Sequence, residues 1–214
     1  MQPERRLGDA LARAPLPAVA SLLALPGHAS GVLLRDWAGK VARRYGASIL
    51  AEVRRELALP LRSVADDPSS RASLPIGLPL ALHVVLVQLA HGGAFTALRA
   101  PLVADGLHQL PALGRLGLRA AGPARILAGS PGLHATLYDQ GRVELVREPV
   151  FCLPALHVHG GGLFREPHWQ AEQLWALDAL MELCGWPSGW QAVEAPAAIV
   201  LRPPESAVGA PGRS

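Results

Sequence analysis

The residues best suited to chemistry lie between Cys152 and His168, where histidines, a cysteine and a glutamate gather in a short stretch. His157 and His159 alternate, and alternating residues of a β-strand point to the same side, so the two imidazoles could share a metal ion. Cys152, Glu166 and His168 could complete the ligand set. A zinc site usually shows two spaced ligand pairs, and this chain has one. We therefore assign no metal ligand and keep metal binding as an alternative.

The run His159-Gly160-Gly161-Gly162 matches the letters of an esterase oxyanion loop. That chemistry also requires a serine in a G-x-S-x-G turn further along the chain, and none is present. The sequence also contains no P-loop and no G-x-G-x-x-G motif. We therefore expect no catalytic residue and no cofactor, and we predict that the protein is not an enzyme.

Tryptophans gather near the end of the chain, where four of the five lie between Trp169 and Trp190. Tryptophan is enriched at protein interfaces, because one side chain buries a large area at small entropic cost. Trp186 and Trp190 flank a loop rich in glycine and proline, and Trp175 lies off the apolar stripe of the last predicted helix. These three tryptophans are candidate partner-binding residues, with burial in the core as the alternative for each.

The composition indicates a folded protein without a nucleic-acid or membrane signature. Half of the 214 residues are hydrophobic and 17% are charged, unlike a disordered chain. The net charge of +3 comes from arginines spread along the chain among acidic residues, so we expect no nucleic-acid partner. Two cysteines make no disulfide framework, and no apolar run reaches the roughly 18 to 20 residues that cross a bilayer. We expect a cytoplasmic protein without a membrane span.

Apolar residues at helical spacing predict most of the structure. The segment LPLALHVVLVQLAHGG, beginning at Leu78, is apolar on nearly every face, as in a helix buried at the centre of a protein. Further helices are expected over about residues 30–46, 49–59 and 167–184. The predicted fold class is mainly α: a compact multi-helix domain with a minor β-hairpin or short strands in the C-terminal half.

The minor β structure and the domain boundaries follow from turn signals. The segments LHATLY and RVELV flank Asp139-Gln140-Gly141 and predict a hairpin, and AAIVLR predicts a short edge strand. We expect four regions along the chain. They are an N-terminal helical region at 1–62, a linker at 63–75, a main helical domain with minor β at 76–202, and a flexible tail at 203–214.

Two segments, in their order and separation, resemble the K component of bacterial type III secretion systems, of the SctK and YscK type and including Hrp-type relatives. They are LPLALHVVLVQLAHGGAFTALRA and HWQAEQLWALDALMELCGWPSGWQ, the latter followed by AAIVLRPP. The resemblance covers roughly Leu16 to Pro203. It implies a non-enzymatic cytosolic adaptor of the sorting platform, peripheral to the inner membrane through its protein partners. Those partners would be the cytoplasmic domain of the inner-membrane ring and the pod protein.

Two other functions remain open from the residues alone. One is a small metal-binding protein or metal-dependent enzyme that uses His157, His159 and His168. The other is a helical ligand-binding domain with a pocket beside His83 and His91, which lie eight residues apart on the central helix. Metal content of the purified protein would separate the first from an adaptor.

Overall fold

The structure, a computed structural model, describes residues 5–57, 72–108 and 112–204. The chain forms two compact units, each built from separate stretches of sequence. The first, here called the sheet unit, consists of Met1–Ala14, Arg99–His134 and Gly141–Ser214. The second, here called the helical unit, consists of Pro15–Leu98 and Ala135–Gln140.

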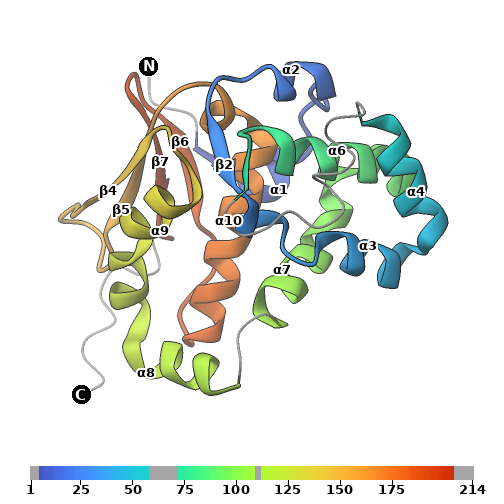
Figure 1. The fold of residues 1–214 in the computed structure, drawn as a ribbon. Coiled ribbons are helices and arrows are strands. Elements are labelled where there is room, and N and C mark those ends of the chain that lie inside the picture. Colours follow the sequence, from blue (N-terminus) through green and yellow to red (C-terminus); the bar gives the residue numbers. More distant parts are fainter. Residues whose placement is uncertain (1–4, 58–71, 109–111, 205–214) are drawn as a thin grey trace. The chain divides into compact units, whose positions relative to one another are not determined.

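A five-stranded antiparallel sheet forms the core of the sheet unit, in the order β1-β6-β7-β5-β4 (Figure 1). The strands are β1 (Arg5–Leu7), β4 (Arg142–Val146), β5 (Ala155–His159), β6 (Gln191–Glu194) and β7 (Ala198–Arg202). The central strand β7 has four consecutive buried residues, Ala198 to Leu201. Since successive side chains of a strand point to opposite faces, both faces of β7 are covered. Val193 and Val200 lie opposite each other across β6 and β7, and they pack with Ala155.

The helix α10 (Pro167–Leu183) lies against this sheet (Figure 1). Pro167 suits the first turn, where its missing N–H loses no hydrogen bond. The helix ends at Leu183, and the chain turns away at Gly185, whose φ of 74° favours glycine; Trp186 N donates to Met181 O there. The predicted last helix is therefore confirmed. Its helical neighbours in the sheet unit are α1 (Gly8–Leu11), α7 (Arg99–His108), α8 (Ala112–Ala128) and the 3-10 turn η3 (Gly162–Arg165).

The helical unit surrounds α6 (Leu78–His91), the apolar helix predicted to be central. From Leu78 to Val87 every residue except Pro79 and His83 is buried, so that prediction is confirmed. The helix packs against α2, α4 and η2. The other elements of this unit are α2 (Val19–Leu23), β2 (His28–Ser30), η1 (Gly31–Leu34), α3 (Trp37–Tyr45), α4 (Ala47–Glu56), β3 (Ser73–Pro75) and η2 (Phe95–Leu98). Strands β2 and β3 pair antiparallel. The helix α9 (Ser130–Leu137) begins in the sheet unit and ends in the helical unit.

The expectation of a mainly α domain with only minor β structure is wrong. The strands of the sheet are three to five residues long, and β1 pairs with β6 across most of the chain, with Arg6 opposite Ala192. Local hydrophobic periodicity cannot show such a long-range pairing. The predicted hairpin is also wrong, because most of LHATLY lies in α9 and β4 pairs with β5 instead. The predicted edge strand is β7, which lies in the middle of the sheet.

The predicted linker and tail fall mostly outside the described residues, at 58–71 and 205–214. The last residues of the predicted linker, Ser73–Pro75, form the strand β3. The two units interleave stretches from both ends and the middle of the chain, whereas the prediction placed regions one after another.

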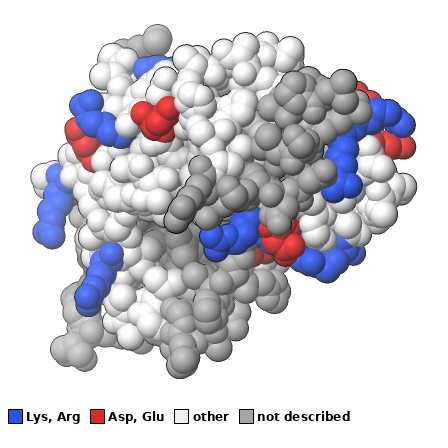
Figure 2. All heavy atoms as spheres, in the orientation of Figure 1, with Lys and Arg blue, Asp and Glu red and all other residues white. Residues whose placement is uncertain are grey.

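Two properties of the described residues bear on partners. Among them, no single helix combines the length and apolar character that crossing a membrane requires. On the face drawn in Figure 2, the Lys and Arg side chains lie in separate patches, several of them beside acidic ones.

Candidate functional site

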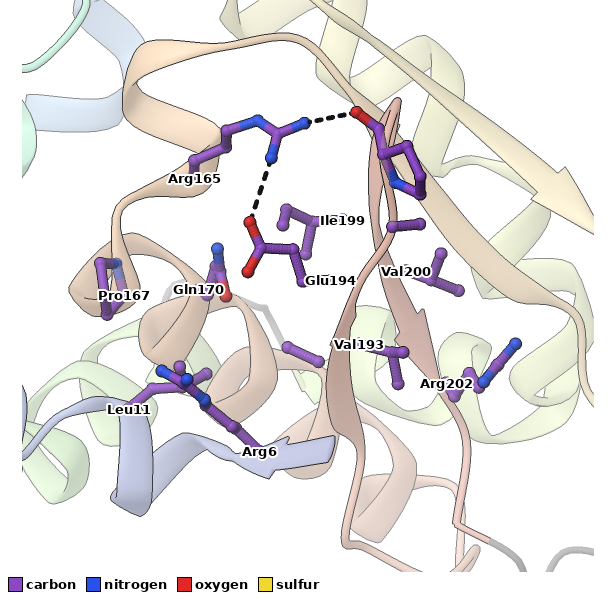
Figure 3. A pocket seen from close by; sticks show the side chains of 13 residues that line it. Arg6, Leu11, Arg165, Pro167, Gln170, Val193, Glu194, Ile199, Val200 and Arg202 are labelled. Carbon is purple, nitrogen blue, oxygen red and sulfur yellow. Dashed lines mark hydrogen bonds and ion pairs between the residues drawn. The ribbon is translucent and has the colours of Figure 1, made fainter. Parts of the chain in front are cut away.

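A pocket of about 900 Å³ lies beside the β6–β7 hairpin of the sheet unit (Figure 3). Its walls come from β1, α1, η3, the first turn of α10 and the hairpin itself. Five of the lining residues are polar: Arg6, Arg165, Gln170, Glu194 and Arg202. All the other lining residues are apolar. A mainly apolar wall with a few polar groups is the usual character of a small-molecule site.

The hairpin provides the apolar wall. Ala195 N donates to Ala198 O at 3.0 Å, which closes the turn between β6 and β7. Val193 and Val200 line the pocket from these two strands, and the half-buried Ala195 packs against them. Pro196 adds a rigid residue in the turn. The backbone of this wall is therefore fixed by sheet pairing on one side and by the closed turn on the other.

Arg165 binds the same hairpin at two points. Its Nη1 donates to Glu194 Oε1 at 3.1 Å, and its Nη2 donates to the carbonyl oxygen of Pro196 at 3.1 Å (Figure 3). The Glu194 side chain is 70% exposed and that of Arg165 is 37% exposed. An ion pair this open to water is worth at most about 1 kcal/mol, so the carboxylate is held weakly.

Gln170 is the buried polar residue of the pocket, with only 6% of its surface exposed. It lies in the first turn of α10, and its Nε2 donates to Phe164 O at 3.2 Å. That bond fixes the orientation of the amide group. No described residue donates a hydrogen bond to the Gln170 Oε1 atom, which therefore keeps its capacity as an acceptor.

The charges of the lining favour an anion. The lining residues carry three guanidinium groups, those of Arg6, Arg165 and Arg202, and one carboxylate, that of Glu194. Arg202 Nε donates to Glu148 Oε1 at 2.9 Å, so a second carboxylate lies close by, outside the lining. The lining contains no Ser, Thr, Cys, His, Lys or Tyr. Its polar groups are therefore guanidinium, carboxylate and amide groups.

The structure does not bring the three histidines of the metal alternative together. His157 and His159 share a face of β5 with ring centroids 6.3 Å apart, and His159 Nε2 pairs with Glu144 Oε2 at 3.0 Å. Burial lowers the pKa of His157, whose Nε2 has no hydrogen-bond partner among the described residues. His168 is fully buried on α10, with Nδ1 at 3.4 Å from Glu166 Oε1. Within the described ranges, no three His, Cys, Asp or Glu side chains are placed to hold a metal ion.

Two of the three candidate partner-binding tryptophans lie in the interior, which corrects the prediction for them. Trp175 is 2% exposed, and its Nε1 donates to Asp9 Oδ1 at 2.8 Å. Trp190 is fully buried, because the Asp178 carboxylate accepts its backbone N–H and draws the loop inward. Trp186 is half-buried. Of the three, only Trp186 keeps exposed surface.

One of the two histidines of the ligand-binding alternative, His91, contacts another helix of the helical unit. His91 Nε2 lies 3.2 Å from Tyr45 Oη, and the two rings meet edge to face at 5.4 Å. His83 is half-buried on the same helix. Their positions on α6 were expected, but the structure gives His91 a partner in α3.

Sequence reasoning missed the pocket residues Arg165, Gln170 and Glu194. The run Arg-Glu-Pro at 165–167 marks a helix start, and Glu-Ala-Pro at 194–196 marks a turn. Those signals predict two local breaks in structure. They carry no information that the two breaks meet, which depends on the pairing of the sheet.

The fold has a counterpart among solved structures. The crystal structure of the Fe(II) unliganded H-NOX protein from K. algicida matches with a TM-score of 0.58, over 80% of this chain and 94% of that chain, at 10% sequence identity. No family model and no curated protein matches this sequence. At such low identity the likeness shows the fold alone, and it too contradicts the mainly α prediction. The resemblance to the secretion K component is not tested by these matches and stays a prediction.

Proposed function

We propose that this protein is a ligand-binding module whose site is the pocket beside the β6–β7 hairpin, and that its ligand is a small amphipathic molecule. The observation that carries this proposal is the composition of the lining: an apolar hairpin wall with three arginines, one glutamate and one buried glutamine. A ligand with an apolar body and a polar end matches such a wall.

Iron is not part of this proposal. The solved H-NOX protein is an Fe(II) form, which raises the question whether this chain could hold such an ion. The described residues do not fit a metal held by several side chains, because no three His, Cys, Asp or Glu converge. His157 and His159 lie on the strand next to Glu144, and the Glu144 carboxylate already bonds to the His159 imidazole.

The test uses three eight-carbon probes that differ only in the head group: octanoate, octylamine and octanamide. Binding to the full-length protein is followed by ligand-observed NMR and calorimetry. Ala195→Trp fills the pocket from its wall and should abolish binding. Ala176→Trp places the same bulk on the exposed face of α10 and should leave binding unchanged. If no probe binds the wild type saturably, or if both variants behave alike, the pocket proposal is wrong.

The secretion adaptor is a second proposal, supported by the exposed surface of Trp186 in the turn after α10. Replacing such an interface residue with alanine typically weakens the free energy of binding by about 2 kcal/mol or more, which is roughly a thirtyfold loss of affinity. The assay is capture of the inner-membrane ring domain and the pod protein by wild type and by Trp186→Ala, with folding checked by circular dichroism. Failure of the wild type to capture either protein would remove this proposal.

A further inference from the structure

We infer that the ligand of this pocket is an oxyanion, a carboxylate or phosphate carried on an apolar body, and that Glu194 occupies the position on Arg165 that the head group of the ligand would take. The ligand would displace the Glu194 carboxylate from Arg165. This inference rests on the proposed function and adds the class of ligand and the residues that select it.

The charged groups of the lining indicate the charge of the ligand. The lining residues include three arginines against the single carboxylate of Glu194, and one of these arginines, Arg202, is paired with Glu148 outside the lining. When Glu194 leaves Arg165, the guanidinium loses the carboxylate that now balances it. An oxyanion restores that balance, whereas an ammonium group would add a further positive charge beside Arg165.

Arg165 and Glu194 differ in how firmly they are held. Arg165 keeps a hydrogen bond to the Pro196 carbonyl whether or not Glu194 is present, so its guanidinium stays at the hairpin. The Glu194 side chain is 70% exposed and can turn into solvent with little loss. A guanidinium offers a planar fork of N–H donors that matches carboxylate and phosphate oxygens. Arg165 is therefore a fixed receptor, and Glu194 is an exchangeable occupant.

The lining beside Arg165 indicates the character of the rest of the ligand. Ile199 lies opposite Glu194 across β6 and β7, so the two side chains share a face of the hairpin, and Ile199 offers an apolar surface beside the Arg165–Glu194 pair (Figure 3). Gln170 Oε1 is a hydrogen-bond acceptor. It would repel a second anionic group on the ligand and would accept a hydrogen bond from a donor on the ligand body. The ligand is thus an amphipathic oxyanion with a single charged end.

The experiment compares octanoate with octanamide on three proteins: wild type, Glu194→Gln and Arg165→Gln. Glu194→Gln removes the competing carboxylate, and octanoate affinity should rise up to about fivefold while octanamide affinity stays the same. Arg165→Gln should lower octanoate affinity about tenfold or more, again without an effect on octanamide. Glu182→Gln changes the net charge by the same amount as Glu194→Gln on an exposed part of α10 and should leave both affinities unchanged.

The outcomes separate this inference from the proposed function. If octanoate and octanamide bind equally well and Arg165→Gln changes neither, the pocket proposal stands and the oxyanion inference is wrong. If octanoate binds through Arg165 but Glu194→Gln has no more effect than Glu182→Gln, the displacement of Glu194 is wrong. If neither probe binds any of the proteins, the proposed function fails and this inference fails with it.

Discussion

Asp178 should be the residue that fastens the loop after α10 to the core of the sheet unit. Its Oδ1 accepts the backbone N–H of Gly189 at 2.7 Å and that of Trp190 at 3.0 Å. Trp190 is fully buried, so the loop cannot move outward without exposing a large aromatic ring. Asp178→Ala leaves both N–H groups without their acceptor. Each unmet buried donor costs about 1–3 kcal/mol, and we expect a loss of about 2–4 kcal/mol because water reaches part of this loop.

The assay is the free energy of unfolding from urea titrations followed by tryptophan fluorescence. Asp178→Asn keeps the oxygen acceptor and should stay within about 1 kcal/mol of wild type. Glu182→Ala removes an exposed carboxylate one turn further along α10 and should stay within about 0.5 kcal/mol. If Asp178→Ala costs no more than Glu182→Ala, the loop is held by something other than this carboxylate and the argument is refuted.

The pH dependence of the same residue gives a second check. Burial raises the pKa of Asp178 above its ordinary value of 3.8, against the two backbone hydrogen bonds, which favour the ionised form. A raised pKa means that the folded protein prefers the protonated acid. The contribution of Asp178 to the free energy of unfolding is therefore greatest at low pH and is lost as the pH rises through the folded pKa. Wild type should therefore lose stability relative to Asp178→Asn as the pH rises from about 3 to about 7. If the difference in stability between wild type and Asp178→Asn stays constant over this range, the pKa of Asp178 is not raised.

Three further predictions concern stability and are checked by urea denaturation midpoints. Leu86→Ala should cost about 2–5 kcal/mol because this side chain is 3% exposed on α6, and Leu86→Asp should cost more; an unchanged midpoint would mean that α6 is exposed. Burial lowers the pKa of His157, so its contribution to the free energy of unfolding is complete above its ordinary pKa of 6.5 and is lost as the pH falls below that value. His157→Gln should make the loss of stability at low pH smaller. Gly77→Ala should cost about 1–3 kcal/mol or more because its Cβ would strike the Leu22 carbonyl oxygen, whereas Gly132→Ala meets nothing and should gain up to about 1 kcal/mol.

The helices of this protein could be predicted from the sequence because their signals are local. Apolar residues at helical spacing, Pro167 at a first turn and Gly185 after a last turn gave α10 within a residue or two. The all-round apolar character of the segment from Leu78 gave α6 as a buried helix. These patterns depend only on neighbours within one or two turns of the same helix.

The sheet could not be predicted in the same way. β1 has three residues, two of them arginines, and its partner β6 lies near the other end of the chain. Such strands are too short for alternation to show, and their burial comes from tertiary packing. The hairpin predicted around Asp139-Gln140-Gly141 failed because most of its expected first strand is helical in α9, and Tyr138 after that helix bridges to Ala29.

The candidate site was missed for a related reason. Histidines and tryptophans are chemically distinctive and therefore stand out in a sequence, but Trp175 and Trp190 serve the core. Arginine and glutamate are common on protein surfaces, so Arg165 and Glu194, which are 29 positions apart, do not stand out in the sequence. They form a candidate site because the chain, after α10, comes back to place the β6–β7 turn beside Arg165. No local sequence pattern shows that the two segments meet.

The pocket also predicts which backbone should respond to a ligand. Arg165 and Gln170 lie on either side of the start of α10, and Glu194 lies at the β6–β7 turn, so an oxyanion bound between them would link two segments that are now joined by an exposed ion pair. At a hundredfold excess over its dissociation constant, such a ligand stabilises the folded protein by about 2.7 kcal/mol. Hydrogen exchange with octanoate should slow at residues 163–171 and 192–199, whereas α6 should respond only to the extent that it opens through global unfolding. Uniform slowing, or slowing that persists in Arg165→Gln, would mean that the probe binds elsewhere on the protein.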